Sequence, residues 1–255
     1  MTHAYFDNAG APIALAHRGF SREGLENSME AFAAAVAMGA THVETDAHGT
    51  VDGVAVALHD SRLDRTTDAH GAVSAQPWDQ VRHAKIGGIS PVPRLDALLD
   101  AFPDTRVNID VKSASSIQPV ADAIERTRAH DRVCIASFST ARRRATVARL
   151  SRPVATSAGT RETAAFALAA AVHRPVTRAL AQVDALQVPP RAGMLTLVSS
   201  RTVAAAHAAA RQVHVWTIND PAQMDALLDL GVDGLVSDRL DLLIEVLRRR
   251  GQWPA

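Results

Sequence analysis

The feature that most constrains the fold is a regular alternation of two kinds of segment. Short runs of β-branched and apolar residues, typical of buried strands, alternate with Ala- and Leu-rich stretches that have the 3.6-residue spacing of amphipathic helices. The expected strands cover residues 13–17, 42–48, 54–59, 106–111, 132–136, 153–156, 183–188, 212–217 and 233–236. The expected helices cover residues 27–38, 93–102, 116–130, 139–149, 161–171, 200–210, 220–230 and 238–249.

Eight strand-then-helix units in 255 residues predict an α/β protein of the (β/α)₈ TIM-barrel class. No linker-like tract divides the chain, so we expect one barrel domain over residues 1–255. A doubly wound open sheet is the alternative, although no glycine-rich phosphate loop follows any expected strand. The irregular segment at about 60–92 is expected to be a longer insertion loop after the second strand. Loops of this length commonly cover or narrow a functional site.

Charge and cysteine content exclude several classes of function. Lys plus Arg and Asp plus Glu number 27 each, and this balance argues against a nucleic-acid partner. The single cysteine, Cys134, excludes an internal disulfide framework and a cysteine metal cluster. The N-terminal residues lack the pattern of a signal peptide, and no window approaches the roughly 20 apolar residues of a membrane span. We therefore expect a cytoplasmic protein without stable membrane association, in an oligomeric state that the sequence does not determine.

Acidic residues stand where two of the expected strands end. Glu44 and Asp46 alternate onto one face of their strand, and Asp110 in NIDVK lies at the end of another. Inward-facing groups at these ends meet at the mouth of a barrel, where active sites form. Carboxylate oxygens suit Mg²⁺ or Ca²⁺ better than Zn²⁺, so the three residues are a candidate divalent-cation site, with Lys112 beside it. The competing interpretation is a surface strand with ordinary polar alternation.

Histidines also stand at strand ends. His17 and His59 each close an expected strand, and two imidazoles that flank a cation can act as a general acid–base pair. The guanidinium of Arg18 is a planar fork that suits phosphate. His48 is expected to support the site by hydrogen bonding. Asp60 is expected to orient a loop, with the alternative that it holds the tautomer of His59.

The segment from AHRGF to ALHD, residues 16–60, resembles the opening signature of the glycerophosphodiester phosphodiesterase family. Members carry HRG, an ENT-like tripeptide, AF, GA, ExD, TxDG and HD in this order. The resemblance continues through LDRTTDAHG, NIDVK, ASFS, VHVWTIND and VDGLVSDRLD, so it spans about residues 13–245. It implies a metal-dependent (β/α)₈ barrel that hydrolyses glycerophosphodiesters to glycerol 3-phosphate and an alcohol.

The resemblance also implies roles for single residues. The implied catalytic pair is His17 and His59, the metal ligands Glu44, Asp46 and Asp110, the phosphate partners Arg18 and Lys112, and the pocket walls Phe138 and Trp216. Asp110 stands where the family usually has Glu, and a side chain shorter by one methylene puts direct ligation in doubt. Ser28 replaces the usual Thr, and we expect Asn27 and Ser28 to cap helix 27–38. Asp238 is expected to cap the last helix.

Three functions remain open. The first is hydrolysis of small, water-soluble glycerophosphodiesters. The second is a lysophospholipase D-like reaction on lysolipids, which predicts an exposed apolar rim or a basic amphipathic segment around the pocket. The insertion at 60–92 carries isolated apolar residues but no such helix, which favours the first function. The third is a noncatalytic barrel that binds phosphate compounds, and this would lack one member of the histidine pair. The sequence leaves open which histidine is the acid, and whether water or the glycerol 2-hydroxyl attacks.

Overall fold

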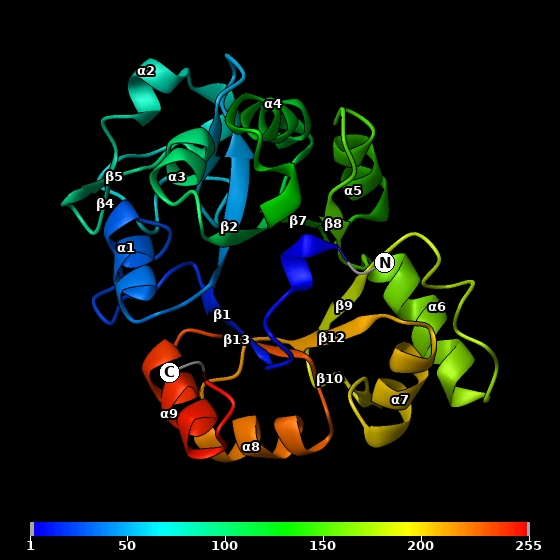
Figure 1. The fold of residues 1–255 in the computed structure, drawn as a ribbon. Helices are drawn as coiled ribbons and strands as arrows, with labels where there is room; N and C mark the ends of the chain where they lie inside the picture. The colour runs from blue at the N-terminus through cyan, green and yellow to red at the C-terminus, as the bar shows by residue number, and fades with distance from the viewer. Residues whose placement is uncertain (1–2, 254–255) are drawn as a thin grey trace.

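The structure is a computed structural model that describes residues 3–253. Eight parallel strands form a nearly closed barrel with helices on the outside, so the expected (β/α)₈ fold is confirmed (Figure 1). Around the barrel the strands follow the order β8-β7-β6-β2-β1-β13-β12-β9. Their bounds are β1 Ile13–His17, β2 His42–Gly49, β6 Arg106–Val111, β7 Val133–Ala136, β8 Ala155–Thr156, β9 Ala185–Val188, β12 Gln212–Val215 and β13 Gly234–Ser237.

The barrel closes between β8 and β9, where the pairing is short. The two strands meet through a parallel bridge between Ser157 and Ala185. Two backbone hydrogen bonds span this seam: the amide of Ala158 donates to the carbonyl of Ala185 (2.8 Å), and that of Asp184 to the carbonyl of Thr156 (2.9 Å). By contrast, β2 and β6 pair over six consecutive positions.

The predicted helices are all present. The outer helices are α1 Met29–Ala37, α3 Leu95–Ala101, α4 Ile117–Thr127, α5 Thr140–Val147, α6 Thr160–Ala171, α7 Ser200–Ala208, α8 Pro221–Asp229 and α9 Leu240–Arg249. Ser28 and Ser139 cap α1 and α5, since each side chain accepts a hydrogen bond from an amide of the first turn. Within residues 3–253, none of the helices has the length and apolar character needed to cross a membrane.

The segment expected as strand 54–59 is a strand of another kind. β3 (Ala55–Ala57) pairs antiparallel with β2, so it is not one of the eight barrel strands. The following insertion is more ordered than a loop, and it packs an apolar cluster of its own around Leu63, Val81 and Ile86. Its elements are η2 Val73–Ala75, α2 Trp78–Val81, β4 Lys85–Ile86 and β5 Ser90–Pro91.

A short N-terminal helix, η1 (Ala4–Phe6), fills the floor of the barrel. Tyr5 and Phe6 are buried against the inward-facing residues Ile13 and Leu15 of β1. The ring of His42 stands edge-on to Tyr5 at 5.1 Å and bonds its backbone carbonyl through Nε2 (2.8 Å). Outward-facing strand residues pack under the helices instead, so each strand contributes alternate side chains to two cores.

Candidate active site

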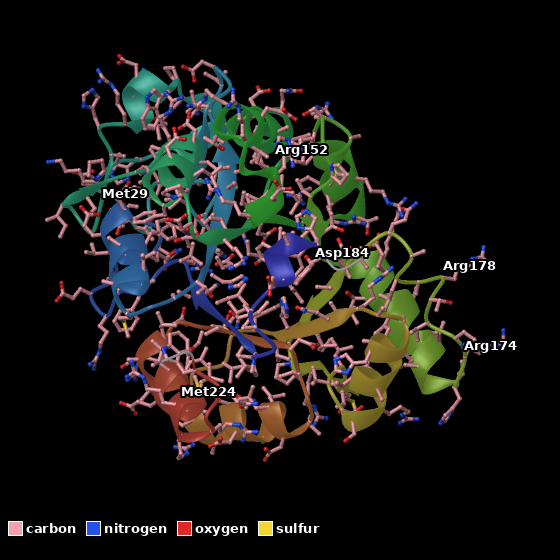
Figure 2. All side chains as sticks on the ribbon, viewed as in Figure 1. Met29, Arg152, Arg174, Arg178, Asp184 and Met224 are labelled. Atoms are coloured by element: carbon pink, nitrogen blue, oxygen red, sulfur yellow. The ribbon has the colours of Figure 1, made fainter. Side chains whose placement is uncertain are left out.

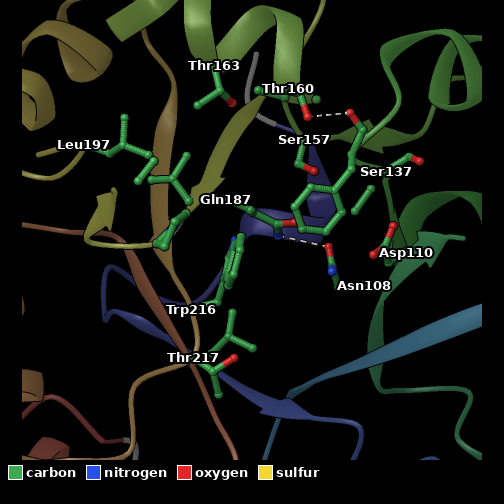
Figure 3. Close-up of a pocket in the computed structure, with 18 of the residues that line it drawn as sticks. Asn108, Asp110, Ser137, Ser157, Thr160, Thr163, Gln187, Leu197, Trp216 and Thr217 are labelled. Carbon is green, nitrogen blue, oxygen red and sulfur yellow. Dashed lines mark hydrogen bonds between the residues drawn. The ribbon is translucent and has the colours of Figure 1, made fainter. Parts of the chain in front are cut away.

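A cavity of about 710 Å³ opens at the carboxyl ends of the barrel strands. The nine site residues that the sequence suggests all line it, although they come from six separate parts of the chain. They are His17, Arg18, Glu44, Asp46, His59, Asp110, Lys112, Phe138 and Trp216. Figure 3 shows part of this cavity, with Asp110, Asn108 and Trp216 around it.

Strand register explains why these residues meet. The Cα of His17 pairs with that of Glu44 across β1 and β2, and Asp46 pairs with Asp110 across β2 and β6. Because side chains alternate along a strand, the inward faces of Ile13 and Leu15 continue into His17. The apolar floor of the barrel therefore changes into a polar mouth along the same strand faces.

The HRG segment has an unusual backbone. Arg18 has a φ of 56° and Gly19 of 81°, and a Cβ on Gly19 would lie 2.6 Å from the backbone of Ala31. Only glycine fits so close to α1 in this conformation. The turn directs the amide of Arg18 toward Glu44, whose Oε2 accepts a hydrogen bond from it at 3.1 Å.

Two cationic side chains neutralise the buried carboxylates. The ammonium of Lys112 lies 2.8 Å from Asp46 Oδ1 and 2.7 Å from Asp110 Oδ2, and Arg18 Nε lies 3.0 Å from Asp46 Oδ2. Burial opposes ionisation of Asp46, but these cations outweigh it and lower its pKa. Burial likewise disfavours charged Lys112, and its two carboxylate partners outweigh that effect and raise its pKa.

Glu44 carries an excess of buried negative charge. Burial, and next the charge of Asp46, raise the pKa of Glu44 to about 7. In addition, Asp110 Oδ1 is buried and makes no hydrogen bond within the described residues. A carboxylate set with this conflict and a spare oxygen is chemically suited to a hard divalent cation.

The fit to a cation lies in donor chemistry and not in a ready-made cage. Among residues 3–253, no group of three or more His, Cys, Asp or Glu side chains is arranged to hold a metal ion as it stands. Lys112 lies between Asp46 and Asp110, and Glu44 faces the amide of Arg18. The ligand triad therefore remains a prediction.

Each histidine of the expected pair is held by a carboxylate. His17 Nδ1 lies 2.6 Å from Asp238 Oδ1, and His59 Nδ1 lies 2.6 Å from Asp60 Oδ1. Burial disfavours protonation of His17, but Glu44 and Asp238 outweigh it and raise its pKa. With Nδ1 engaged in both rings, Nε2 is the nitrogen that each ring presents for another partner.

Asp238 is not the helix cap that the sequence suggests. The position before α9 is Arg239, whose side chain makes no capping hydrogen bond, and Asp238 points to His17 instead. Asn219 holds Asp238 by donating to its Oδ2 at 2.8 Å and by accepting from its backbone amide at 2.9 Å. The signal available in the sequence was the position of Asp238 directly after β13, at the same barrel mouth.

An ion-pair chain joins the second histidine to the HRG turn. Asp60 accepts from Arg65 Nε at 2.6 Å, and Arg65 and Arg18 both donate to Oε1 of Glu26 (2.7 and 3.0 Å). Asp60 therefore both holds the His59 ring and fixes the following loop, so the two expected roles coexist.

Two supporting residues differ in how well the sequence indicated them. His48 Nε2 bonds the backbone carbonyl of His59 at 3.1 Å, which confirms its expected supporting role. The sequence favours a helix cap over substrate contact for Asn27, but Ser28 alone caps α1. The Asn27 amide instead donates to Asp46 Oδ2 at 3.0 Å, and its oxygen accepts from Thr45. Asn27 thus orients a predicted metal ligand.

Phe138 and Trp216 form an aromatic wall on one side of the cavity. Their rings lie 5.7 Å apart in an edge-to-face arrangement, and Lys112 Nζ lies 5.9 Å from the Phe138 ring centre. Gln187, which the sequence did not single out, donates to Asn108 Oδ1 at 2.9 Å beneath this wall (Figure 3).

Beyond the aromatic wall the cavity continues as an apolar arm that sequence reasoning missed. We give this name to the part of the cavity bounded by α6 and by the hairpin of β10 (Arg191–Ala192) and β11 (Leu195–Thr196). Its apolar lining residues are Ala164, Ala167, Leu168 and Ala171 on α6, and Pro189, Ala192, Leu195 and Leu197 opposite. The hydroxyl-bearing Thr160 and Thr163 of α6 line the same cavity. No charged side chain belongs to this lining within the described residues.

Comparisons with known proteins agree with this geometry. Residues 17–242 match the model of the glycerophosphoryl diester phosphodiesterase family. A Mycobacterium tuberculosis protein named "Probable glycerophosphodiester phosphodiesterase 2" is 45% identical over 96% of this chain and 94% of its own length. A glycerophosphodiester phosphodiesterase from Agrobacterium tumefaciens superposes with a TM-score of 0.74 at 24% identity, covering 93% of this chain and 99% of that one. An Oleispira antarctica phosphodiesterase, solved with its product sn-glycerol-3-phosphate, gives 0.79 at 20% identity, covering 96% and 99%.

Proposed function

Because the chain belongs to the glycerophosphoryl diester phosphodiesterase family, we propose that its cavity hydrolyses glycerophosphodiesters with His17 and His59 as the acid–base pair. The chain is a phosphoric diester hydrolase, and the products are glycerol 3-phosphate and an alcohol. The observation that carries the proposed roles is the placement of two carboxylate-held imidazoles in one cavity with two cationic side chains.

Arg18 and Lys112 would bind the phosphodiester. The substrate is a monoanion whose negative charge increases as the attacking oxygen bonds to phosphorus, so fixed cations stabilise the transition state more than the ground state. Both residues are already held in place by carboxylates, Arg18 by Glu26 and Asp46, and Lys112 by Asp46 and Asp110. Phe138 and Trp216 would wall the alcohol portion.

The histidines would move the protons. Nε2 of one imidazole takes the proton from the attacking oxygen, which is water or the glycerol 2-hydroxyl, and Nε2 of the other gives a proton to the departing alkoxide. Asp238 and Asp60 fix the two Nδ1 atoms as donors and leave Nε2 free for these transfers.

Glu44, Asp46 and Asp110 would hold the divalent cation on which the family generally depends. When bound, Mg²⁺ or Ca²⁺ supplies Lewis-acid polarisation and neutralises charge. The buried, unpaired Asp110 Oδ1 and the raised pKa of Glu44 support this assignment.

Glycerol 3-phosphate release from glycerophosphocholine tests the proposal, with Mg²⁺, with Ca²⁺ and with a chelator. We expect His17→Ala and His59→Ala each to lower kcat/KM by about 10²- to 10⁴-fold at unchanged thermal stability. His83→Ala, which changes an exposed histidine outside the cavity lining, is the matched control and should turn over normally. Near-normal turnover in either cavity variant would defeat the assigned pair.

The apolar arm supports lysolipids as a second substrate class. The insertion at 60–92, considered alone, favoured small glycerophosphodiesters. Each methylene that enters the arm should raise kcat/KM by up to about fourfold. A series of lysophosphatidylcholines of rising chain length, kept below micelle formation, measures this slope against glycerophosphocholine. A rate that does not depend on chain length would exclude the arm as a hydrocarbon site and leave the small-substrate activity intact.

A further inference from the structure

The exposed large hydrophobic side chains are not scattered over the molecule. Of the seven in the described residues, Val51 and Ile89 lie elsewhere. Phe138, Leu168 and Leu195 line the cavity, and Val172 and Met194 lie close in the chain to Leu168 and Leu195. We call these five the apolar rim: Phe138, Leu168, Val172, Met194 and Leu195. Clustered exposure of this kind marks an interaction surface, whereas single exposed residues need no explanation.

Four of the five rim residues belong to two elements, α6 with its C-terminal cap and the hairpin. Leu168 of α6 and Leu195 of the hairpin line the same cavity from its two sides. Val172 lies one helical turn beyond Leu168, on the same face, and Met194 precedes Leu195 at the hairpin turn. Met194 is 95% exposed, the highest value among these residues. The rim thus runs from residues that line the cavity to residues that project into solvent.

The exposed charge of the segment that carries four of the five rim residues has one sign. Residues 160–201 contain five exposed arginines, in a protein whose net charge is zero. They are Arg161, Arg174, Arg178, Arg191 and Arg201, and none forms an ion pair with a described residue. Arg174 and Arg178 extend outward after α6 (Figure 2). Arg191 lies on the hairpin, where its Nη2 donates to the Met194 carbonyl.

The carboxylates of the same segment are turned inward. Glu162 is buried and paired with Arg143, and Asp184 accepts hydrogen bonds from the amide and hydroxyl of Thr156. A two-fold contact between copies of this chain through the rim would therefore set arginine against arginine, because such a contact uses the same patch twice. A partner needs an apolar interior and a negatively charged surface.

We propose that the apolar rim and its arginines dock the protein onto an anionic phospholipid bilayer. Aliphatic side chains flanked by arginines insert at the boundary between headgroups and acyl chains, while the guanidinium groups bind lipid phosphates and carboxylates. No spanning segment is needed. This docking departs from the sequence-based expectation of no stable membrane association. It also places the apolar arm against the hydrocarbon layer, where single-chain phosphodiesters reside.

Vesicle sedimentation tests the proposal. The full-length protein is mixed with vesicles of phosphatidylcholine, with and without phosphatidylserine, and the bound fraction is measured. We expect binding that requires phosphatidylserine and weakens as salt is raised. Arg174→Gln with Arg178→Gln should weaken it by roughly fivefold per residue. Val172→Ser with Met194→Ser, at two exposed rim positions outside the cavity lining, should weaken it at least about tenfold.

The matched control is Val51→Ser with Ile89→Ser, the two other exposed large hydrophobic residues. It should bind vesicles like the wild type. The proposal is overturned if wild type does not bind phosphatidylserine vesicles, or if the control loses as much binding as the rim variant. It is also overturned if light scattering shows a dimer that the rim variant converts to a monomer. Turnover of glycerophosphocholine in the absence of lipid reports the catalytic proposal separately, so either can fail alone.

Discussion

His17 owes its orientation to a residue more than two hundred positions away in the chain. Asp238 bonds its Nδ1 at 2.6 Å and is itself held on both sides by Asn219. His59, in contrast, is held by its own neighbour Asp60, which Arg65 fixes in turn. Each imidazole is thus positioned by a carboxylate at its Nδ1, on the opposite side of the ring from Nε2.

Asp238→Asn should lower kcat by about 10- to 100-fold with little change in KM, because an amide no longer fixes the His17 tautomer. Turnover of glycerophosphocholine measures the loss, and the ring ¹⁵N shifts of His17 report the change of tautomer directly. Asp241→Asn, three residues along and paired with Arg239 away from the cavity, is the control. Unaltered ring shifts in the Asp238 variant would contradict a positioning role.

The sequence predicted the polar half of the site because its residues sit at strand ends in a regular pattern. Parallel register then brings Glu44 to His17 and Asp46 to Asp110 without further assumptions. The contact of Asp238 with His17 was not predicted, because VSDRLD is equally typical of a helix-capping sequence. Only the parallel pairing of β13 with β1 shows that the residue after β13 faces His17, the last residue of β1.

At the scale of elements, η1 is a packed part of the barrel floor. Tyr5 is fully buried among small inward residues such as Ala155 and Ala185, which leave room for its ring. Its hydroxyl makes no hydrogen bond to any described residue. The packing of the Tyr5 ring, and not a hydrogen bond from its hydroxyl, therefore stabilises the floor of the barrel.

Tyr5→Ala should cost about 3–5 kcal/mol of unfolding free energy, measured in denaturant, because it opens a cavity in the floor. Tyr5→Phe keeps the ring, removes an unpaired polar group and should be at least as stable as wild type. A Tyr5→Ala loss within about 0.5 kcal/mol, the scale of surface substitutions, would show that η1 does not seal the barrel.

Other elements show where pattern reading stops. β3 has strand-like residues, and the connection 50–54, which contains Asp52-Gly53 and is too short for a parallel crossover, is the local sign that it turns back antiparallel to β2. The apolar arm is formed by α6 and by a hairpin that follows it about twenty residues later in the chain. An Ala-rich amphipathic helix has the same sequence pattern whether its second face contacts solvent, lipid or a ligand. The sequence therefore gives no sign of an apolar rim at α6, where the structure has Leu168 and Val172 exposed.

At the scale of the whole molecule, two neutral histidines inside the barrel tie stability to pH. Burial, above all, lowers the pKa of both His42 and His214 to about 4. Both pack against η1, His42 on Tyr5 and His214 on Phe6. The unfolded chain binds protons near pH 6.5 while the folded one does not, so this stability is present above pH 6.5 and is lost as pH falls toward 4.

The loss should approach roughly 3 kcal/mol per histidine, at about 1.4 kcal/mol per pKa unit. Unfolding free energies measured between pH 4 and 7 give the slope, and His214→Gln should flatten it relative to wild type and to the exposed control His83→Gln. Glu44, whose raised pKa acts in the opposite direction, is present in every variant and cancels in the comparison. An unchanged slope in His214→Gln would refute the account.

The short pairing of β8 with β9 should determine where the barrel opens transiently. Two backbone bonds hold this seam, so the amides of Ala158 and Asp184 should exchange with deuterium sooner than those of the β2–β6 ladder. Since α6 follows β8 and lines the apolar arm, transient opening of this seam should widen the arm. Glu44, Asp46 and Asp110 lie on β2 and β6, which pair over six positions. We therefore expect the carboxylates to keep their positions while the β8–β9 side opens for a large substrate.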